Sequence, residues 1–432
     1  MENVLVKEGL TAKDRVYEKR RWIVLVASCF VNLCIGSLYA WSVFAAPMGA
    51  HLSTLAGADV GSLALVFSVA NAVGPITMIS GGVVNDRIGP RWVVFAGGAL
   101  FGAGMIASGF ATSVPVLTVS YGLGCGLGMG MVYGATVSNA VKFFPDKRGF
   151  VGGVTTASYG ISSVIVPLIA NALIAELDVT AAFKILGVSM AVIMCIAALF
   201  IEPCPAGFAP AGWQLADDGP RTVVRDKSWR SMLGDPMFYI MLAMLCCGAF
   251  AGLMVVSQAS IIAQGLVGFG AAQAAAAVSA LALANTAGRI VAGLLSDKLG
   301  PVATLRIVFA LLVCGVGALY VSNASTVVLF VGGLLVVGLC FGSVMGVYPG
   351  FTALRFGSKN NSVNYGIMFI GFALAGILGP SIMNALFEMF GSYQPAFAVA
   401  AALGVVGIGL TYAYARFARL RKQGSDSKEA FK

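Results

Sequence analysis

The sequence is short of charge. Only 10% of its 432 residues are Asp, Glu, Lys or Arg, whereas soluble domains carry about 25%. Hydrophobic residues make up 59% of the chain, and the mean hydropathy is +0.90. Apolar stretches of roughly 18 residues or more recur along the whole length, which excludes a soluble globular domain and a disordered chain. The sequence therefore predicts an all-α protein that crosses a membrane many times.

Reactive chemistry is equally scarce. The G-x-S-x-G, H-E-x-x-H and phosphate-loop patterns are absent, and His51 is the one histidine. With so little acid–base chemistry we expect no catalytic residue, no metal, no cofactor and no enzyme. The nine cysteines show no pairing pattern, so no disulfide framework is predicted. Residues 1–21 are polar and basic, and the apolar segment from Trp22 is too long for a cleaved signal peptide.

The apolar segments predict twelve transmembrane helices. Of the 27 Lys and Arg, all but Lys184 and Arg289 then lie on one side of the membrane. They are in the termini, in the loops that follow even-numbered spans, or at the span ends that border these loops. This positive-inside pattern predicts an inner membrane protein with both termini cytoplasmic, and it explains the net charge of +9 without a nucleic-acid partner. The predicted spans are 22–47, 61–84, 92–113, 115–141, 150–175, 181–201, 237–264, 273–295, 303–322, 325–353, 363–388 and 393–417.

The chain divides into two halves. A stretch rich in Pro, Gly and charge at 202–236 predicts a cytoplasmic linker between bundles at 22–201 and 237–417, with tails at 1–21 and 418–432. The loop "GVVNDRIGP" (82–90) returns as "GLLSDKLGP" (293–301), in the same place in each half. Two six-span repeats predict a secondary transporter, monomeric, with its substrate near mid-membrane between the halves.

Arg289 is a cation inside a predicted span, "LALANTAGRIVAGLLSDKLGP" (281–301). An arginine at the centre of a membrane helix costs about 2.5–3.5 kcal/mol. All 18 acidic residues lie in termini, loops or span ends, so the sequence offers no counter-ion at mid-depth. A guanidinium has paired donors that match a carboxylate, and Asn285, one turn earlier on the same face, is a substrate-binding candidate that can add a hydrogen bond. We therefore predict an anionic ligand; the alternative is a structural arginine bonded to backbone carbonyls and water.

Other residues of the predicted spans are candidates for the substrate cavity or for helix packing. Tyr39, Tyr133 and Tyr159 are the candidate aromatic contacts. Glycines recur every fourth residue in one span and predict a face on which helices pack closely: Gly122, Gly126, Gly130 and Gly134.

The two G-x-x-x-D-[RK]-x-G-P loops resemble the signature loop of the major facilitator superfamily. This resemblance covers the whole chain and implies two pseudo-symmetric six-helix bundles, the major facilitator fold. It also implies that the loop charges hold the cytoplasmic face closed as gate residues, namely Asp86, Arg87, Asp297 and Lys298. The alternative is that they are ordinary short-turn charges obeying the positive-inside rule.

Further segments resemble the oxalate/formate antiporter branch, a relative of the monocarboxylate porters. They are "YAWSVFAAP" (39–47), "VYG" (132–134), "FFPDKRG" (143–149), "SYG" (158–160), "ANTAGRIVAGLLSDKLG" (284–300) and "NYG" (364–366). The resemblance implies that Arg289 binds the substrate carboxylate. The second cation of the oxalate site, a lysine, aligns with Phe372, and two aromatic positions of that site align with Phe341 and Met345.

One cation and an apolar wall of Phe341, Met345, Phe369 and Phe372 favour a small monocarboxylate such as lactate or pyruvate over oxalate. A dianion would bring an uncompensated charge into a cavity of low dielectric constant. Asn285 stands where proton-moving porters usually have an aspartate, so two modes remain open: co-transport of a proton, or exchange of anions. The alternatives are an oxalate/formate-type antiporter, a sugar or drug carrier, a channel, and a nutrient sensor that does not transport.

Overall fold

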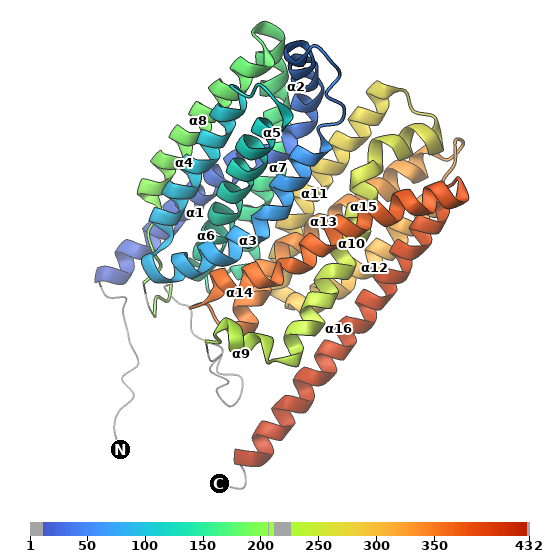
Figure 1. Ribbon diagram of the computed structural model, residues 1–432. Coiled ribbons are helices and arrows are strands. Elements are labelled where there is room, and N and C mark those ends of the chain that lie inside the picture. The colour runs from blue at the N-terminus through green and yellow to red at the C-terminus, as the bar shows by residue number, and fades with distance from the viewer. Residues whose placement is uncertain (1–11, 206, 211–225, 430–432) are drawn as a thin grey trace.

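The computed structural model describes residues 12–205, 207–210 and 226–429, and within these ranges the regular elements are all helices (Figure 1). Twelve segments of the described chain are long and apolar enough to cross a membrane. Each predicted span overlaps one of them, which confirms the number and order of the spans. The chain is a twelve-span membrane protein.

Ten helical elements form the first half. They are α1 (Ala12–Ile35), the 3-10 helix η1 (Gly36–Ala40), α2 (Trp41–Ala56), α3 (Ala64–Ile88), α4 (Pro90–Ser108), α5 (Val114–Leu117), the π-helix η2 (Thr118–Cys125), α6 (Gly126–Phe143), α7 (Arg148–Glu176) and α8 (Val179–Phe200). The first span joins α1, η1 and α2, and the fourth joins α5, η2 and α6.

The short helix α9 (Trp229–Leu233) precedes the second half. That half contains α10 (Pro236–Val267), α11 (Ala271–Leu299), α12 (Pro301–Val321), α13 (Val327–Phe356), α14 (Asn361–Met368), α15 (Ile370–Phe390) and α16 (Gln394–Glu429). Its fifth span joins α14 and α15. Figure 1 shows the two halves side by side, with α9, the start of α1 and the end of α16 at one end of the molecule, called here the termini side.

The repeated loops adopt the same backbone conformation in both halves. Gly89 has φ 91° and ψ 164°, and Gly300 has φ 82° and ψ 154°. Because L side chains rarely adopt such positive φ values, glycine is required at both positions. The prolines that follow, Pro90 and Pro301, begin α4 and α12, where a missing N–H removes no helical hydrogen bond. The sequence repeat is therefore a structural repeat.

The predicted glycine face packs as expected, against α3. A Cβ on Gly126 would lie 2.5 Å from the Ala70 carbonyl oxygen, and one on Gly130 would lie 2.0 Å from that of Gly74. Such distances leave no room for a side chain, so the glycines allow α6 and α3 to touch backbone to backbone. The same close approach at Gly134 sets this helix against Met78.

The terminal helices extend beyond the predicted spans. Helix α1 begins at Ala12, inside the predicted tail 1–21, and α16 continues to Glu429, past the predicted boundary at 417. Parts of the predicted tails and linker lie outside the described residues: 1–11, 206, 211–225 and 430–432.

The two ends of the linker each contact a different half. At its start, Arg20 donates to both carboxylate oxygens of Glu202 (2.7 and 2.8 Å), and Asn139 donates to the Glu202 carbonyl. At its end, the Lys227 N–H donates to the Phe356 carbonyl, and the Lys227 carbonyl accepts from Asn364. The linker is thus fixed to the first half on one side and to α13 and α14 on the other.

A buried carboxylate completes this second attachment. Asp235 is 2% exposed and forms ion pairs with Lys227 and with Arg355, the latter at 3.3 Å. Burial raises the pKa of the Asp235 carboxyl, but hydrogen bonds from Lys227 and the Met237 N–H, with the charge of Arg355, hold this pKa below its ordinary value overall. The ionised form of Asp235 therefore stabilises the fold.

The halves meet mainly along three helix pairs, α7 with α11, α7 with α13, and α3 with α14, with smaller contacts of α6 with α13 and α14 and of α3 with α15. The closest approaches lie toward the termini side, where a Cβ on Gly149 would be 2.3 Å from the Gly293 carbonyl oxygen and one on Gly82 would be 2.9 Å from Val363 N. Contacts this close between backbones hold the halves together at that end of the membrane.

Candidate functional site

Arg289 lies on α11 between the two halves and is 6% exposed. Its Nε donates to Asn285 Oδ1 at 2.9 Å, as the spacing of one turn predicts, and its Nη1 donates to the Thr156 carbonyl at 2.7 Å. The Tyr133 hydroxyl also interacts with the guanidinium. Across the described chain no carboxylate forms an ion pair with it. The cation is therefore held by neutral groups alone.

Glycines on both neighbouring helices fix the position of Arg289. A Cβ on Gly153 of α7 would lie 2.3 Å from its carbonyl oxygen, and one on Gly346 of α13 would lie 2.4 Å from the same atom. Helix α11 therefore packs closely between α7 of the first half and α13 of its own half. A Cβ on Gly160 would lie 3.4 Å from Nε, so a larger residue there would crowd the guanidinium.

A chain of aromatic rings connects the two halves around this cation. Tyr159 lies between Tyr39 (ring centroids 5.4 Å apart) and Tyr133 (5.2 Å), and Tyr133 contacts Phe369 at 5.7 Å. Phe369 stacks on Phe372 at 4.6 Å. Edge-to-face and stacked pairs at these separations are attractive. The series therefore joins α6, α7 and η1 of the first half to the α14–α15 span of the second.

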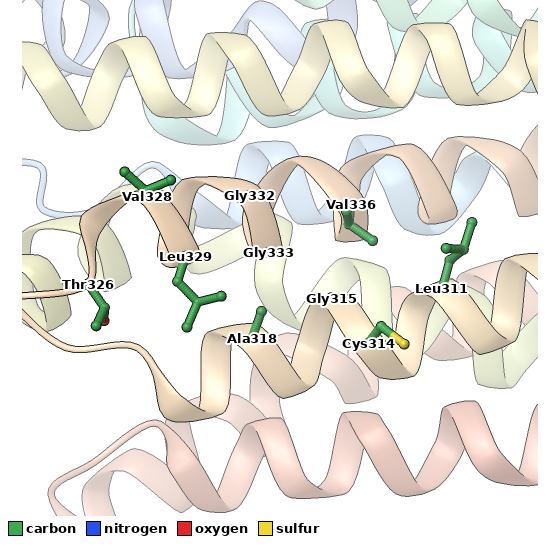
Figure 2. Close-up of a pocket in the computed structure, with 10 residues that line it drawn as sticks. All are labelled: Leu311, Cys314, Gly315, Ala318, Thr326, Val328, Leu329, Gly332, Gly333 and Val336. Atoms are coloured by element: carbon green, nitrogen blue, oxygen red, sulfur yellow. The ribbon is translucent and has the colours of Figure 1, made fainter.

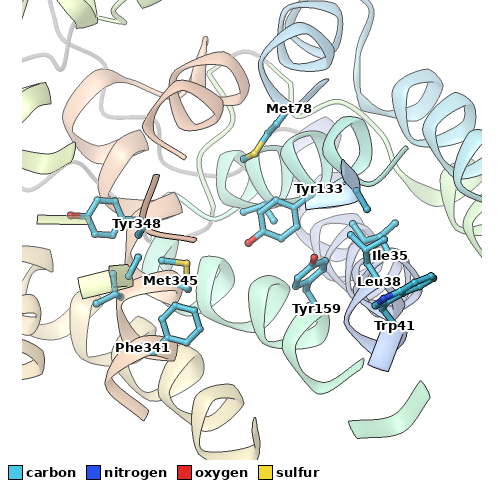
Figure 3. Packing of buried hydrophobic residues seen from close by; sticks show 14 of the residues in the cluster. Ile35, Leu38, Trp41, Met78, Tyr133, Tyr159, Phe341, Met345 and Tyr348 are labelled. Atoms are coloured by element: carbon cyan, nitrogen blue, oxygen red, sulfur yellow. The ribbon is translucent and has the colours of Figure 1, made fainter. Parts of the chain in front are cut away.

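Helix α13 contributes the remaining predicted residues. Phe341 stacks on Phe372 with centroids 6.3 Å apart, and Met345 is 3% exposed. Figure 3 shows Phe341 and Met345 opposite Tyr133 and Tyr159, with the Tyr133 hydroxyl directed toward them. Of the nine predicted substrate-binding residues, Arg289 and Asn285 thus lie on α11, the three tyrosines on η1, α6 and α7, and the other four on α13 and the α14–α15 span.

The 3-10 helix η1 explains how Tyr39 reaches the group. A Cβ on Gly36 would lie 2.3 Å from the Tyr159 carbonyl oxygen, so glycine lets the first span approach the backbone of α7. The tighter winding of η1 interrupts the span at this contact, and such interruptions recur at functional hinges. Gly36 and η1 together bring Tyr39 against Tyr159.

Asp297, predicted as a gate residue, contacts the other half. Its two carboxylate oxygens accept from the N–H groups of Gly149 and Phe150, each at 2.7 Å. These N–H groups belong to the first turn of α7, where the helix dipole favours a negative charge. Asp297 therefore ties the loop of the second half to α7 of the first.

The counterpart in the first half has different contacts. Asp86 pairs with Lys142 of the same half at 2.9 Å, and the Lys142 ammonium reaches across to the Lys359 carbonyl at 3.1 Å. Arg87 and Lys298 are exposed, and neither forms an ion pair within the described ranges. Of the four predicted gate residues, Asp297 bridges the halves directly and Asp86 does so through Lys142.

Comparison with known proteins decides the family. The family model described as the Major Facilitator Superfamily matches residues 22–380. The chain belongs to the major facilitator superfamily. Both the resemblance read from the loops and the expected fold are thereby confirmed, and the fold and relatives are those of transporters.

Curated relatives of this superfamily are similar over nearly the whole chain. The oxalate:formate antiporter of Oxalobacter formigenes is 30% identical over 92% of this chain and 93% of its own length. Monocarboxylate transporter 13 of Rattus norvegicus is 26% identical over 90% and 87%. Among solved structures, the transporter FucP in the outward conformation superposes with a TM-score of 0.69 at 14% identity, covering 91% of this chain and 99% of FucP, which supports the fold.

Several residues of the site were not predicted from the sequence. Thr156 contributes a backbone carbonyl, and no side-chain pattern marks such an acceptor. Gly160 belongs to the "SYG" segment (158–160), and no pattern in the sequence indicates its contact with the guanidinium. Lys142 precedes the "FFPDKRG" segment and could have been noted as a basic residue facing the repeated loop. Tyr365, which contacts Phe369 at 5.9 Å and interacts with Tyr133, stood in the "NYG" motif.

A separate groove lies between α12 and α13 (Figure 2). It has a volume of about 580 Å³, is mainly apolar and contains none of the predicted site residues. Its lining residues are Leu311, Cys314, Gly315, Ala318, Thr326, Val328, Leu329, Gly332, Gly333 and Val336.

Proposed function

We propose that this superfamily member is a secondary transporter of small monocarboxylates, lactate- or pyruvate-like, whose carboxylate binds Arg289. The observation that carries the proposal is a buried guanidinium with no carboxylate partner among the described residues. A buried charge without a counter-ion is costly, and a bound carboxylate offsets that cost. The relatives named for oxalate:formate exchange and for monocarboxylate transport support the substrate class.

The arrangement of donors limits how the acid binds. Arginine has five N–H donors; Asn285 and Thr156 each occupy one. The Tyr133 hydroxyl, which interacts with the same guanidinium, can accept from a third, so at least two N–H groups remain for the substrate. A carboxylate can therefore bind in a bidentate manner while Asn285 keeps the guanidinium oriented.

The wall opposite the cation favours a short apolar tail. Phe341, Met345, Phe369 and Phe372 offer rings and a thioether but no second charge. A dicarboxylate would leave one negative charge unpaired at a cost of several kcal/mol. We therefore place oxalate/formate exchange second, on the strength of the antiporter relative.

The contacts of Arg289 suggest how binding is coupled to alternating access. The same guanidinium that would hold the substrate bonds Thr156 of the other half. A carboxylate that draws the guanidinium away from Thr156 weakens a contact between the halves, about two turns of α11 from the closure made by Asp297. We propose a monomer in the inner membrane, both termini cytoplasmic, with Asp86 and Asp297 stabilising the state closed on the cytoplasmic side. Arg87 and Lys298 would then act in another state of the cycle.

Counterflow in proteoliposomes tests the proposal. Vesicles preloaded with lactate, pyruvate, formate or oxalate are assayed for uptake of the labelled acid, with Arg289→Gln beside wild type. We expect saturable lactate or pyruvate exchange that Arg289→Gln lowers roughly 100-fold. Arg306→Gln is the control: this arginine bonds Thr411 on α16, outside the site, and should exchange normally.

Three outcomes would contradict the proposal. Oxalate outcompeting lactate and pyruvate would establish the antiporter alternative. Full activity of Arg289→Gln would show that Arg289 does not bind the substrate carboxylate. Failure of every acid to exchange would favour a sugar or drug carrier, a channel or a non-transporting sensor.

An imposed inward proton gradient, without internal substrate, separates the two coupling modes. Such a gradient drives uptake of the acid by a proton symporter and not by an anion exchanger.

A further inference from the structure

A second groove, of about 540 Å³, lies on the outer surface of the first half between α1 and α8. Its rim is formed by apolar side chains that are 41–56% exposed, and its floor by Ala27 and Ala197, each 7% exposed. The rim residues are Trp22, Ile23, Val26, Phe30, Ile193, Ile196 and Phe200. Because α1 and α8 are membrane spans, this face meets lipid rather than water.

The groove begins at the termini side, beside two lysines. Lys19 lies three and four residues before Trp22 and Ile23, which places it on the same face of α1, one turn beyond the groove. Lys147 has its Nζ 5.8 Å from the centre of the Trp22 ring. Both lysines are exposed, and in the described ranges neither forms a salt bridge.

The neighbouring arginines are already neutralised. Arg20 bonds both oxygens of Glu202, and Arg21 pairs with Glu18 at 2.6 Å and with Asp146 at 3.0 Å. Among the side chains that the structure describes, the positive charge left at this end of the groove therefore comes from Lys19 and Lys147. Trp22 separates it from the apolar part, as tryptophans do at the level of lipid headgroups.

We propose that this groove binds an anionic phospholipid, with its phosphate against Lys19 and Lys147 and one acyl chain between α1 and α8. From Trp22 to Phe30 the groove follows eight residues of helix, about 12 Å. One leaflet contributes about 15 Å of hydrocarbon, so a single chain can lie along it. Basic residues at the membrane surface attract anionic lipids, and an apolar rim with charge at one end matches a lipid rather than a soluble anion.

Quenching of Trp22 fluorescence by brominated lipids tests the site. The full-length protein is placed in phosphatidylcholine nanodiscs that contain a small fraction of lipid with a brominated acyl chain, as either phosphatidylglycerol or phosphatidylcholine. The Trp22→Phe variant identifies the part of the quenching that belongs to Trp22. We expect phosphatidylglycerol to quench Trp22 at least roughly fivefold more effectively at equal mole fraction.

Two sets of variants distinguish specific lipid binding in the groove from general attraction of anionic lipid to a basic protein. Lys19→Gln with Lys147→Gln should abolish the preference, whereas Arg416→Gln with Arg419→Gln, exposed cations on α16, changes net charge equally and should keep it. Ala197→Leu fills the floor and should reduce quenching by both lipids. Equal quenching by the two headgroups would show ordinary boundary lipid only and overturn the proposal. A preference that survives loss of both lysines would overturn it as well.

Discussion

Replacing Asn285 by aspartate tests the central feature of the site, a cation without a counter-ion. Asn285 Oδ1 already accepts from Arg289 Nε at 2.9 Å, so the nearly isosteric Asn285→Asp change adds one negative charge where geometry is already suited to it. The local charge falls from +1 to zero. A substrate carboxylate would then meet a neutralised guanidinium and a like charge beside it.

The size of the effect follows from the distance. The new carboxylate and a substrate carboxylate bound to the same guanidinium would lie about 6–8 Å apart, and their repulsion is about 2–3 kcal/mol at an effective dielectric constant of 20. Substrate binding should therefore weaken roughly 30- to 140-fold. Asn285→Ala removes the acceptor without adding charge, so it should weaken binding by only about 1 kcal/mol.

Affinity is measured by calorimetry on purified protein, and exchange by counterflow with the same acid. Thermal unfolding without substrate provides a second readout: because the new carboxylate pairs with a buried cation, Asn285→Asp should not lower the melting temperature. A folded Asn285→Asp protein with wild-type affinity at neutral pH would refute the reasoning that the missing counter-ion of Arg289 sets the affinity for the carboxylate.

Three further predictions concern the helix contacts and the closure. Gly160→Val should raise the substrate Kd about tenfold by crowding the guanidinium, while Gly317→Val, whose Cβ meets nothing within 4 Å, should not; equal effects would contradict this. Asp297→Asn should open the termini side more than Asp86→Asn in cysteine-accessibility assays, because only Asp297 caps a helix of the other half. Asp235→Asn should destabilise the fold by about 2–3 kcal/mol at pH 7; since the folded-state pKa of Asp235 is lowered, the difference in melting temperature should be present above about pH 4 and shrink as the pH falls through that pKa.

The sequence alone was sufficient for the number of spans, the two halves and the isolated cation. Hydropathy reports these features directly, because each span must satisfy its own backbone in lipid and must be apolar along its whole length. The two similar loops, at 82–90 and 293–301, located the repeat. The positions of the acidic residues, in termini, loops or span ends, showed that Arg289 has no counter-ion at mid-depth. The spacing of four residues also placed Asn285 on the same helix face as Arg289 and predicted the glycine face of the fourth span.

Which helices touch was decided by the tertiary structure. Spans that are apolar on every side have no periodicity to mark the face that packs inward, so no pattern showed that Thr156, 133 residues before Arg289, accepts its hydrogen bond. The same limit hid the different contacts of Asp86 and Asp297, although their loops share the G-x-x-x-D-[RK]-x-G-P pattern. Asp297 reaches the start of α7 and Asp86 pairs with Lys142, because close backbone packing at Gly149 and Gly293 fixes how the halves meet.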